Sequence, residues 1–245
     1  MTHPTKRELR DARRAERRAA EHATAVRALR RRRLAWLGGA AALAAVVVAG
    51  AIALSSSGGA AAAPAPTSSA LLDGIPERDG VLGDPDAPLT VTEFVDLQCP
   101  VCAQAAATTL PTLIDDYVRT GKAKLEVRTL HFLGPDSVRA ACVAAGAERQ
   151  GRLWPFLEAF FAAQGPENSG YVTDDFLREV AGAARVDADA ALAYAETAAA
   201  EAPLARANAD AGRLGVDATP TFAVARGDRP ATVVPTGELL AELGR

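Results

Sequence analysis

The chain has 245 residues, 49% hydrophobic and 23% charged, with a formal net charge of −3, values that are ordinary for a globular protein. Residues 1–33 hold twelve Lys/Arg and four Asp/Glu, a net charge of +8, which leaves −11 for the remainder. An acidic main body argues against nucleic acid as its partner, because phosphate binding needs a positive surface.

An uncharged apolar run follows the basic N-terminal segment over residues 34–54. A helix of this length spans about 31 Å, the thickness of a bilayer core. The arginines precede the run, so the positive-inside rule places residues 1–33 in the cytoplasm and the rest of the chain outside. We expect a single-pass transmembrane anchor. A cleaved signal peptide is the main alternative, and a buried soluble helix would leave the charge asymmetry unexplained.

A linker and then a folded domain are expected after the anchor. Residues 55–70 are rich in Ala, Pro, Ser and Gly, a composition with no means of building a core, and order is expected to begin near Leu71, within a linker assigned to residues 55–75. The domain is therefore assigned to residues 76–245.

The expected elements of this domain mix strands and helices. The sequence predicts the following order: a buried strand (88–97), a helix (100–120), an alternating strand (122–132), a helical block (134–214), two strands (219–225 and 231–235) and a short helix (236–244). Breaks in the helical block are expected near Gly151, Gly165 to Gly170, Asp187 and Pro203. The fold class is therefore α/β.

Cys99 and Cys102 stand two residues apart where the first strand meets the first helix. A zinc site would need both, together with Cys142 and His131, although zinc ligands usually come as two close pairs. A structural disulfide would close too small a loop to constrain the unfolded chain much.

A redox pair is the third interpretation of these cysteines. The first sulfur of such a pair lies at a helix N-terminus, where free N–H groups and the helix dipole favour the thiolate. Cys99 would be the exposed, acidified sulfur, and Cys102, one turn inside the helix, the less exposed resolving thiol. Pro100 suits the first turn of that helix.

At this point the chain resembles the DsbA-like thiol–disulfide oxidoreductases of the thioredoxin fold. "EFVDLQCPVC" is followed much later by "GVDATPTFAV", and the helical block fills the gap between Cys102 and Pro220. The resemblance covers about residues 76–245. It implies a thioredoxin-like fold with an inserted helical subdomain, here preceded by one transmembrane helix.

The resemblance also implies roles for single residues. The bond before Pro220 would be cis, in a loop that faces the active site, and Thr219 would border the substrate groove. Glu93 would be a buried acid that helps to move the proton of the buried thiol. From the residues alone, Glu93 can equally be a strand residue facing solvent, and Thr-Pro a plain loop.

The expected function is a membrane-anchored, extracytoplasmic protein-disulfide oxidoreductase that introduces disulfides into exported proteins. Its partners would be exported proteins with cysteines and a membrane protein that reoxidises the pair; no metal or organic cofactor is indicated. The Pro-Val dipeptide departs from the Pro-His of strongly oxidising DsbA, so a reductase or isomerase is the alternative. A non-catalytic binding module with the same fold is the alternative of another class.

The remaining distinctive residues are interpreted as structural. Cys142 is expected to be a small buried apolar residue, with a regulatory or mixed-disulfide role left open. His131 is expected at a strand end, and the aromatic residues Trp154, Phe156, Phe160 and Phe161 in the core.

Overall fold

The structure is a computed structural model that describes residues 70–245. The predicted basic segment, the predicted anchor over 34–54 and most of the predicted linker lie outside the described residues. Among residues 70–245, no helix is long and apolar enough to cross a membrane.

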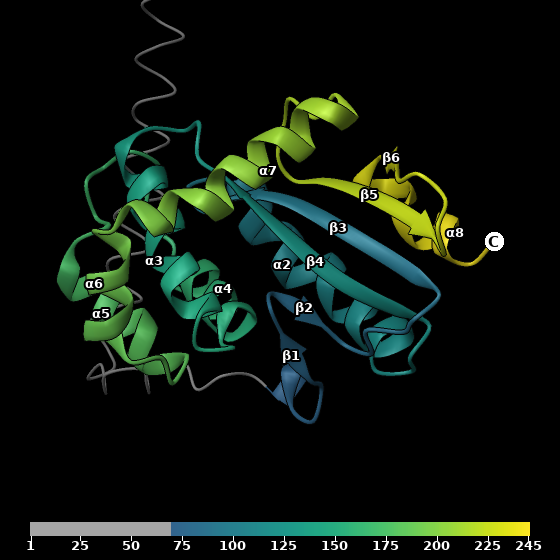
Figure 1. Cartoon of the computed structure of the whole chain (residues 1–245), viewed down its shortest axis with the longest axis horizontal. Helices are drawn as coiled ribbons and strands as arrows, with labels where there is room; N and C mark the ends of the chain where they lie inside the picture. Colours follow the sequence, from purple (N-terminus) through teal and green to yellow (C-terminus); the bar gives the residue numbers. More distant parts are fainter. Residues whose placement is uncertain (1–69) are drawn as a thin grey trace, which may run out of the picture. The chain divides into compact units, whose positions relative to one another are not determined.

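A six-stranded sheet organises the described part of the chain, in the order β1-β2-β4-β3-β5-β6 (Figure 1). Strands β3 and β4 are parallel, and every other neighbouring pair is antiparallel. The strands are β1 (Glu77–Arg78), β2 (Val81–Leu82), β3 (Leu89–Asp96), β4 (Ala123–Leu130), β5 (Thr221–Arg226) and β6 (Thr232–Val234).

Helices connect the strands and cover the sheet. The α-helices are α2 (Pro100–Leu113), α3 (Pro135–Glu148), α4 (Leu153–Ala162), α5 (Asp174–Ala183), α6 (Ala188–Ala195), α7 (Glu201–Leu214) and α8 (Leu239–Leu243). The short 3-10 helices are η1 (Ala70–Leu72), η3 (Ala198–Ala200) and η4 (Thr236–Glu238), and the π-helix η2 (Ile114–Val118) continues α2. The predicted order of elements is therefore confirmed from the first long strand to the last helix.

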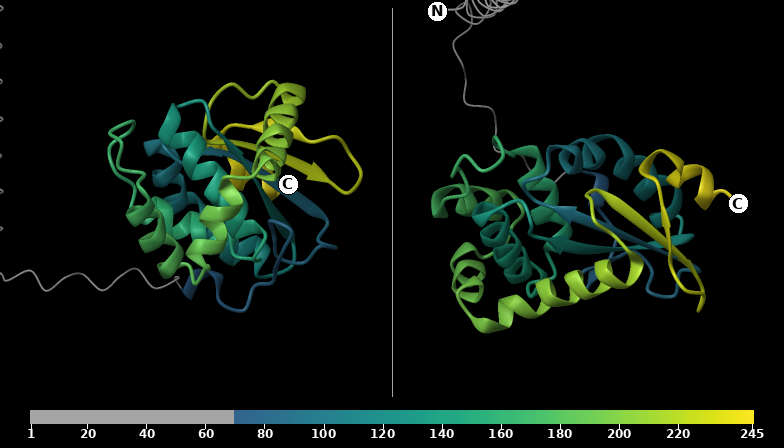
Figure 2. Two further views of the ribbon diagram at one scale, coloured as in Figure 1. Left: turned by 60° about the vertical axis from the view of Figure 1, so that its left-hand side comes forward. Right: turned by 90° about the horizontal axis from the view of Figure 1, so that it is seen from above.

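Alternating side chains on the strands build two cores, as the period of a strand requires. On β3, Val91 and Val95 belong to the larger core, which includes residues of α2 and α8. Phe94 points the other way and packs with Ala207 and Ala211 of α7. The sheet thus separates α2 and α8 from α7 (Figures 1 and 2).

The predicted helical insertion is confirmed, since α3 to α7 all lie between β4 and β5. Helices α3 to α6 gather beyond the end of the sheet where β3 and β4 finish (Figure 2). The Thr173 side chain caps α5, and the Asp187 side chain caps α6. Pro203 falls in the first turn of α7 instead of before it, a position where the missing N–H costs no helical bond.

Two features at the N-terminal end differ from the prediction. Strands β1 and β2 form a hairpin that the sequence analysis missed, because strands of two residues carry no alternation. The residues near Leu71 are ordered, as expected, but they precede the start assigned to the domain: Ala70–Leu72 forms a 3-10 helix, and Leu71, Leu72 and Ile75 pack against the larger core.

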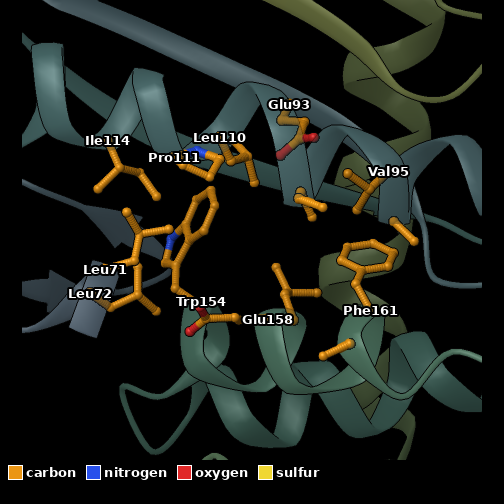
Figure 3. A pocket seen from close by; sticks show the side chains of 15 residues that line it. Leu71, Leu72, Glu93, Val95, Leu110, Pro111, Ile114, Trp154, Glu158 and Phe161 are labelled. Carbon is orange, nitrogen blue, oxygen red and sulfur yellow. The ribbon is translucent and has the colours of Figure 1, made fainter. Parts of the chain in front are cut away.

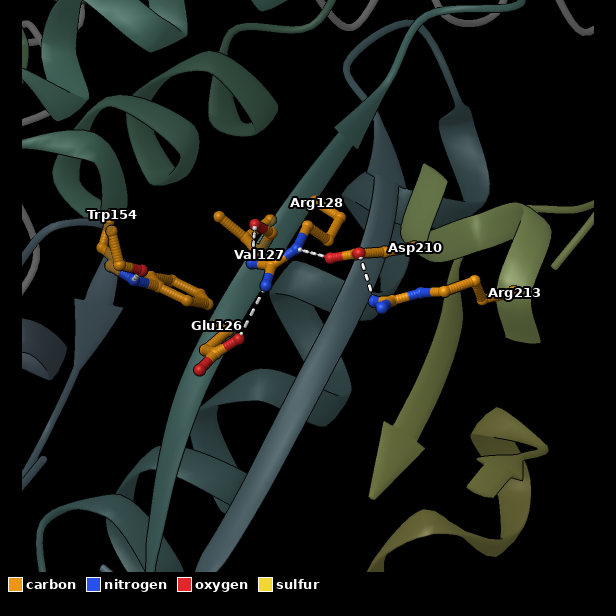
Figure 4. A network of polar contacts seen from close by, with 7 residues as sticks. Glu126, Val127, Arg128, Trp154, Asp210 and Arg213 are labelled. Carbon is orange, nitrogen blue, oxygen red and sulfur yellow. Dashed lines mark hydrogen bonds and ion pairs between the residues drawn. The ribbon is translucent and has the colours of Figure 1, made fainter. Parts of the chain in front are cut away.

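A network of charged side chains fastens α7 to the sheet (Figure 4). Arg128 on β4 donates to Glu126 at 2.9 Å and to Asp210 of α7 at 2.6 Å. Arg213 bonds the other oxygen of Asp210. Arg128 and Asp210 are 28% and 22% exposed, so their pair is less screened by solvent than a fully exposed pair.

Candidate active site

Cys99 is the N-cap residue of α2, with Pro100 in the first helical turn. Strand β3 ends at Asp96, and the backbone N–H of Cys99 donates to the Asp96 carbonyl oxygen at 2.9 Å. This tight turn places the sulfur where the free N–H groups of the helix converge. Both Cys99 and Cys102 are thiols in the structure.

The two sulfurs have strongly divergent acidities. The pKa of Cys99 is lowered to about 5, first by a hydrogen bond from the Cys102 side chain and then by Thr219 and the N–H groups of Cys102 and Val101. The pKa of Cys102 is raised well above its ordinary value, first by the same hydrogen bond with Cys99 and then by burial. Cys99 is therefore the sulfur that exists as thiolate at neutral pH.

The burial of the pair corrects one expectation. Cys102 is fully buried, as expected for the inner thiol, but Cys99 is itself only 7% exposed. The loop before β5 contributes to this cover, since the carbonyl oxygen of Thr219 lies 3.4 Å from the Cys99 sulfur. The peptide bond between Thr219 and Pro220 is cis, as the resemblance implies.

Glu93 lies in the central strand of the sheet, between Val127 of β4 and Phe222 of β5. It is 2% exposed, so the alternative of a solvent-facing glutamate is wrong. Burial raises its pKa to about 8, and its Oε1 atom has no hydrogen-bond partner among residues 70–245. It lies on the α2 side of the sheet, because it lines a cavity together with Ala103 and Ala106 of α2.

Asp96 is a structural centre of the site that the sequence analysis did not single out. It is fully buried, and its carboxylate accepts from the Ser137 hydroxyl at 2.6 Å and from the N–H groups of Gln98 and Leu133. One carboxylate thus joins the end of β3, the turn before Cys99 and the start of α3. The only sequence signal was its place at the end of a buried strand.

Two glutamines that the sequence analysis did not predict join the same turn to the insertion. Gln164 belongs to the insertion, and Gln98 belongs to the turn. The Gln164 amide donates to the carbonyl oxygens of Leu97 at 2.7 Å and Cys99 at 3.2 Å. The fully buried Gln98 donates to the Tyr171 hydroxyl and accepts from the Asn168 N–H. The active-site turn is therefore fixed by residues that follow it by about seventy positions.

The remaining candidates lie apart from this chemistry. His131 directly follows β4, as expected, and is partly buried. Cys142 lies on α3 and is half-buried instead of buried, with its pKa raised by burial and by Glu201 and Glu196. Within residues 70–245, no group of three or more His, Cys, Asp or Glu side chains is placed to hold a metal ion, so the zinc interpretation has no support.

Comparison with known proteins identifies the family. A family model described as thioredoxin matches residues 77–229. A probable disulfide bond formation protein D of Bacillus cereus is 32% identical over 101 residues, which is 40% of this chain and 47% of that protein. The chain thus matches less than half the length of this curated relative.

Two solved structures share the fold over 67% of this chain and 90% of their own. BdbD from Bacillus subtilis, in oxidised form, has a TM-score of 0.60 at 23% identity. A thioredoxin-like oxidoreductase from Silicibacter pomeroyi has a TM-score of 0.54 at 30% identity. The parallel β3–β4 pair and the inserted helices agree with this fold, and the chain belongs to the thioredoxin family.

Proposed function

We propose that this protein is a protein thiol–disulfide oxidoreductase that introduces disulfides into exported proteins through Cys99 and Cys102. The observation that carries the proposal is the Cys99 sulfur at the N-terminus of α2, acidified by its neighbours. A pKa of about 5 leaves roughly one thiol per hundred thiolates at pH 7. Stabilising the dithiol form in this way shifts the exchange equilibrium toward transfer of the disulfide from the protein to its substrate.

The reaction begins from the Cys99–Cys102 disulfide. A substrate thiolate attacks the Cys99 sulfur, the bond between the two cysteines breaks, and Cys102 leaves as a thiolate that takes up a proton. A second substrate thiolate then attacks the substrate sulfur of the mixed disulfide and expels Cys99 as a stable thiolate. The substrate loses two electrons and two protons, and the cysteine pair gains the two electrons.

Glu93 is the group proposed to supply the proton to Cys102. A thiolate in a buried position is costly, so its release needs a proton source close at hand. Glu93 is buried on the same side of the sheet as α2, and its pKa of about 8 keeps it protonated at neutral pH. It can therefore give a proton when Cys102 leaves and take it back when the disulfide re-forms.

Thr219 and Pro220 are proposed to bind the substrate backbone. The Thr219 carbonyl oxygen lies beside the Cys99 sulfur, so a peptide in extended conformation placed there would bring its own cysteine to Cys99.

The cellular setting completes the proposal. The basic segment and the apolar run over 34–54 support a protein anchored by one helix, with its N-terminus in the cytoplasm and its catalytic domain outside the membrane. A membrane partner that accepts two electrons would return the pair to the disulfide form.

The redox state of the pair in living cells tests the direction of the reaction. Cells would be quenched with acid, their thiols alkylated and the protein resolved by gel shift, in a Cys142→Ser background so that only the active pair is counted. A mostly oxidised pair is expected. A mostly reduced pair would contradict the proposed direction and favour a reductase or isomerase, for which the uncharged Val101 beside the thiolate is the supporting observation.

A further inference from the structure

An apolar cavity of about 390 Å³ lies between α2 and α4, on the side of the sheet where Glu93 is buried (Figure 3). Leu110, Trp154 and Phe161 form much of its wall, and Leu71 closes one end. It opens to solvent where Ala107 of α2 and Ala162 of α4 are exposed. Its volume is that of a small-molecule site.

One polar group in this cavity lacks a partner. The Glu93 carboxyl reaches from β3 toward the cavity (Figure 3), and its Oε1 has no hydrogen-bond partner among the described residues although the side chain is 2% exposed. A buried polar atom left unpaired costs free energy, which a ligand that bonds it would recover.

The charge of the lining indicates the kind of ligand. Among the described residues that line the cavity, two are carboxylic, Glu93 and Glu158, and none is Lys, Arg or His. The described lining residues offer an anionic ligand no counter-charge, whereas an ammonium group would complete an ion pair with Glu93 inside an apolar wall.

We propose that this cavity binds a small molecule with a compact apolar body and a single amine, whose ammonium group pairs with Glu93. The apolar body fills the space between Trp154 and Phe161, and the amine displaces the proton of the carboxyl. Neither cysteine of the pair lines this cavity, so ligand binding there does not require the redox reaction, although the site shares Glu93 with it.

Three matched probes test the proposal by calorimetry on the purified full-length chain: adamantylmethylamine, adamantylmethanol and adamantanecarboxylate. They share one apolar body and differ in the head group. The amine is expected to bind about tenfold more tightly than the alcohol, because a charge-assisted bond replaces a neutral one, and the carboxylate should not bind. Equal affinities, or no binding of the amine, would overturn the proposal.

Fluorescence of Trp154 reports whether the amine sits in this cavity, measured in a Trp36→Phe background so that a single tryptophan contributes. Ala107→Phe places a ring at the mouth and is expected to abolish the signal. Thr108→Phe adds the same ring on the same helix, at an exposed residue that does not line the cavity, and should leave binding unchanged. Equal losses in the two variants would place the probe elsewhere and refute the site.

Glu93→Gln keeps the size of the side chain and removes its charge. The preference for the amine over the alcohol should then disappear while the alcohol still binds. If the preference persisted, the ion pair would be wrong.

Occupancy should also slow the release of Cys102, because the ion pair with the bound ammonium keeps Glu93 ionised, its proton released to solvent, and leaves it none to give. This last effect rests on the proposed function, whereas the titrations do not. Binding without slowing would therefore contradict the proton-transfer role of Glu93 and leave the ligand site standing.

Discussion

The side-chain amide of Gln164 lies 3.2 Å from the carbonyl oxygen of Cys99, across 65 positions of sequence. The insertion therefore holds the backbone of Cys99 in place through a direct hydrogen bond. Its bond to the Leu97 carbonyl fixes the two ends of the turn together.

Gln164→Leu should raise the pKa of Cys99. The change removes the side-chain donor from the carbonyl oxygens of Leu97 and Cys99, of which the Cys99 oxygen keeps the N–H groups of Cys102 and Ala103. It loosens the turn that aims N–H groups at the sulfur, with a loss of about 1–3 kcal/mol in the free energy of unfolding. The rate of Cys99 alkylation by iodoacetamide against pH gives the pKa. Gln150→Leu is the matched control, because Gln150 also bonds backbone groups, at Asp187 within the insertion. An unchanged alkylation midpoint in Gln164→Leu would reduce Gln164 to a purely structural role.

Cys102→Ala should raise the pKa of Cys99 more than the loss of any backbone hydrogen bond to that sulfur would, because the Cys102 thiol is the largest cause of the lowered pKa. In the wild-type dithiol form the alkylation midpoint is expected near pH 5, and Cys102→Ser should keep part of the effect through its hydroxyl donor. Cys142→Ala should not move the midpoint. A Cys102→Ala midpoint that stayed near pH 5 would assign the acidity to the helix N-terminus alone.

The free energy of unfolding of the dithiol form should depend on pH, because the Cys99 thiolate stabilises the folded state. The folded pKa of Cys99, about 5, lies below its ordinary value of 9.0, so the stabilisation is present above about pH 9 and is lost as the pH falls through 5. Chemical unfolding of the reduced protein at several pH values, compared with Cys99→Ala, measures it. A difference between the two proteins that is constant from pH 5 to 9 would argue against a thiolate in the folded state.

Glu93 should give the free energy of unfolding the opposite dependence on pH. Its folded pKa of about 8 lies above its ordinary value of 4.5, so the folded state binds a proton that the unfolded state has lost, and stability falls as the pH rises from about 4.5 to 8. Glu93→Gln should remove this fall and slow release of Cys102 by about tenfold or more. The first effect appears in unfolding curves and the second in single-turnover exchange. A Glu93→Gln variant with an unchanged rate and pH profile would exclude the proton transfer.

Gly146→Ala on α3 should destabilise the insertion although alanine is the better helix former. A Cβ atom there would lie 2.7 Å from the backbone of Ala191 on α6, so the helices must move apart, at a cost of about 1–3 kcal/mol. Gly182→Ala on α5 is the matched control, since a Cβ there meets nothing within 4 Å and should be neutral or stabilising by up to about 1 kcal/mol. Thermal unfolding of both variants compares the costs, and equal effects would disprove the close helix contact.

The sequence predicted the order of elements and the insertion because these depend on local patterns. Each of the signals used lies within a few neighbouring residues: the alternation around Glu93, the proline after Cys99 and the Thr-Pro before β5. The period of β3 also places Glu93 with Val91 and Val95 on one face, although burial of a carboxyl cannot be inferred from that period alone.

The contacts that hold the turn before Cys99 in place could not be predicted in this way. Gln164 and Asn168 sit in a polar loop whose composition predicts a turn and nothing more. Their contact with the turn before Cys99 is created only when α4 packs beside α2. The burial of Cys99 likewise depends on the pairing of β5 with β3. The prediction from the sequence, which could not include this pairing, therefore gave that sulfur too much exposure.

The antiparallel pairing of β5 with β3 has a consequence for how the protein is made. This pairing joins residues more than a hundred positions apart, and Thr219 is synthesised long after Cys99. The emerging chain therefore carries Cys99 and Cys102 before the strand that covers them exists. Contacts between such distant residues form late, so the nascent polypeptide is open to premature oxidation and to capture by other cysteines until its final third has been added.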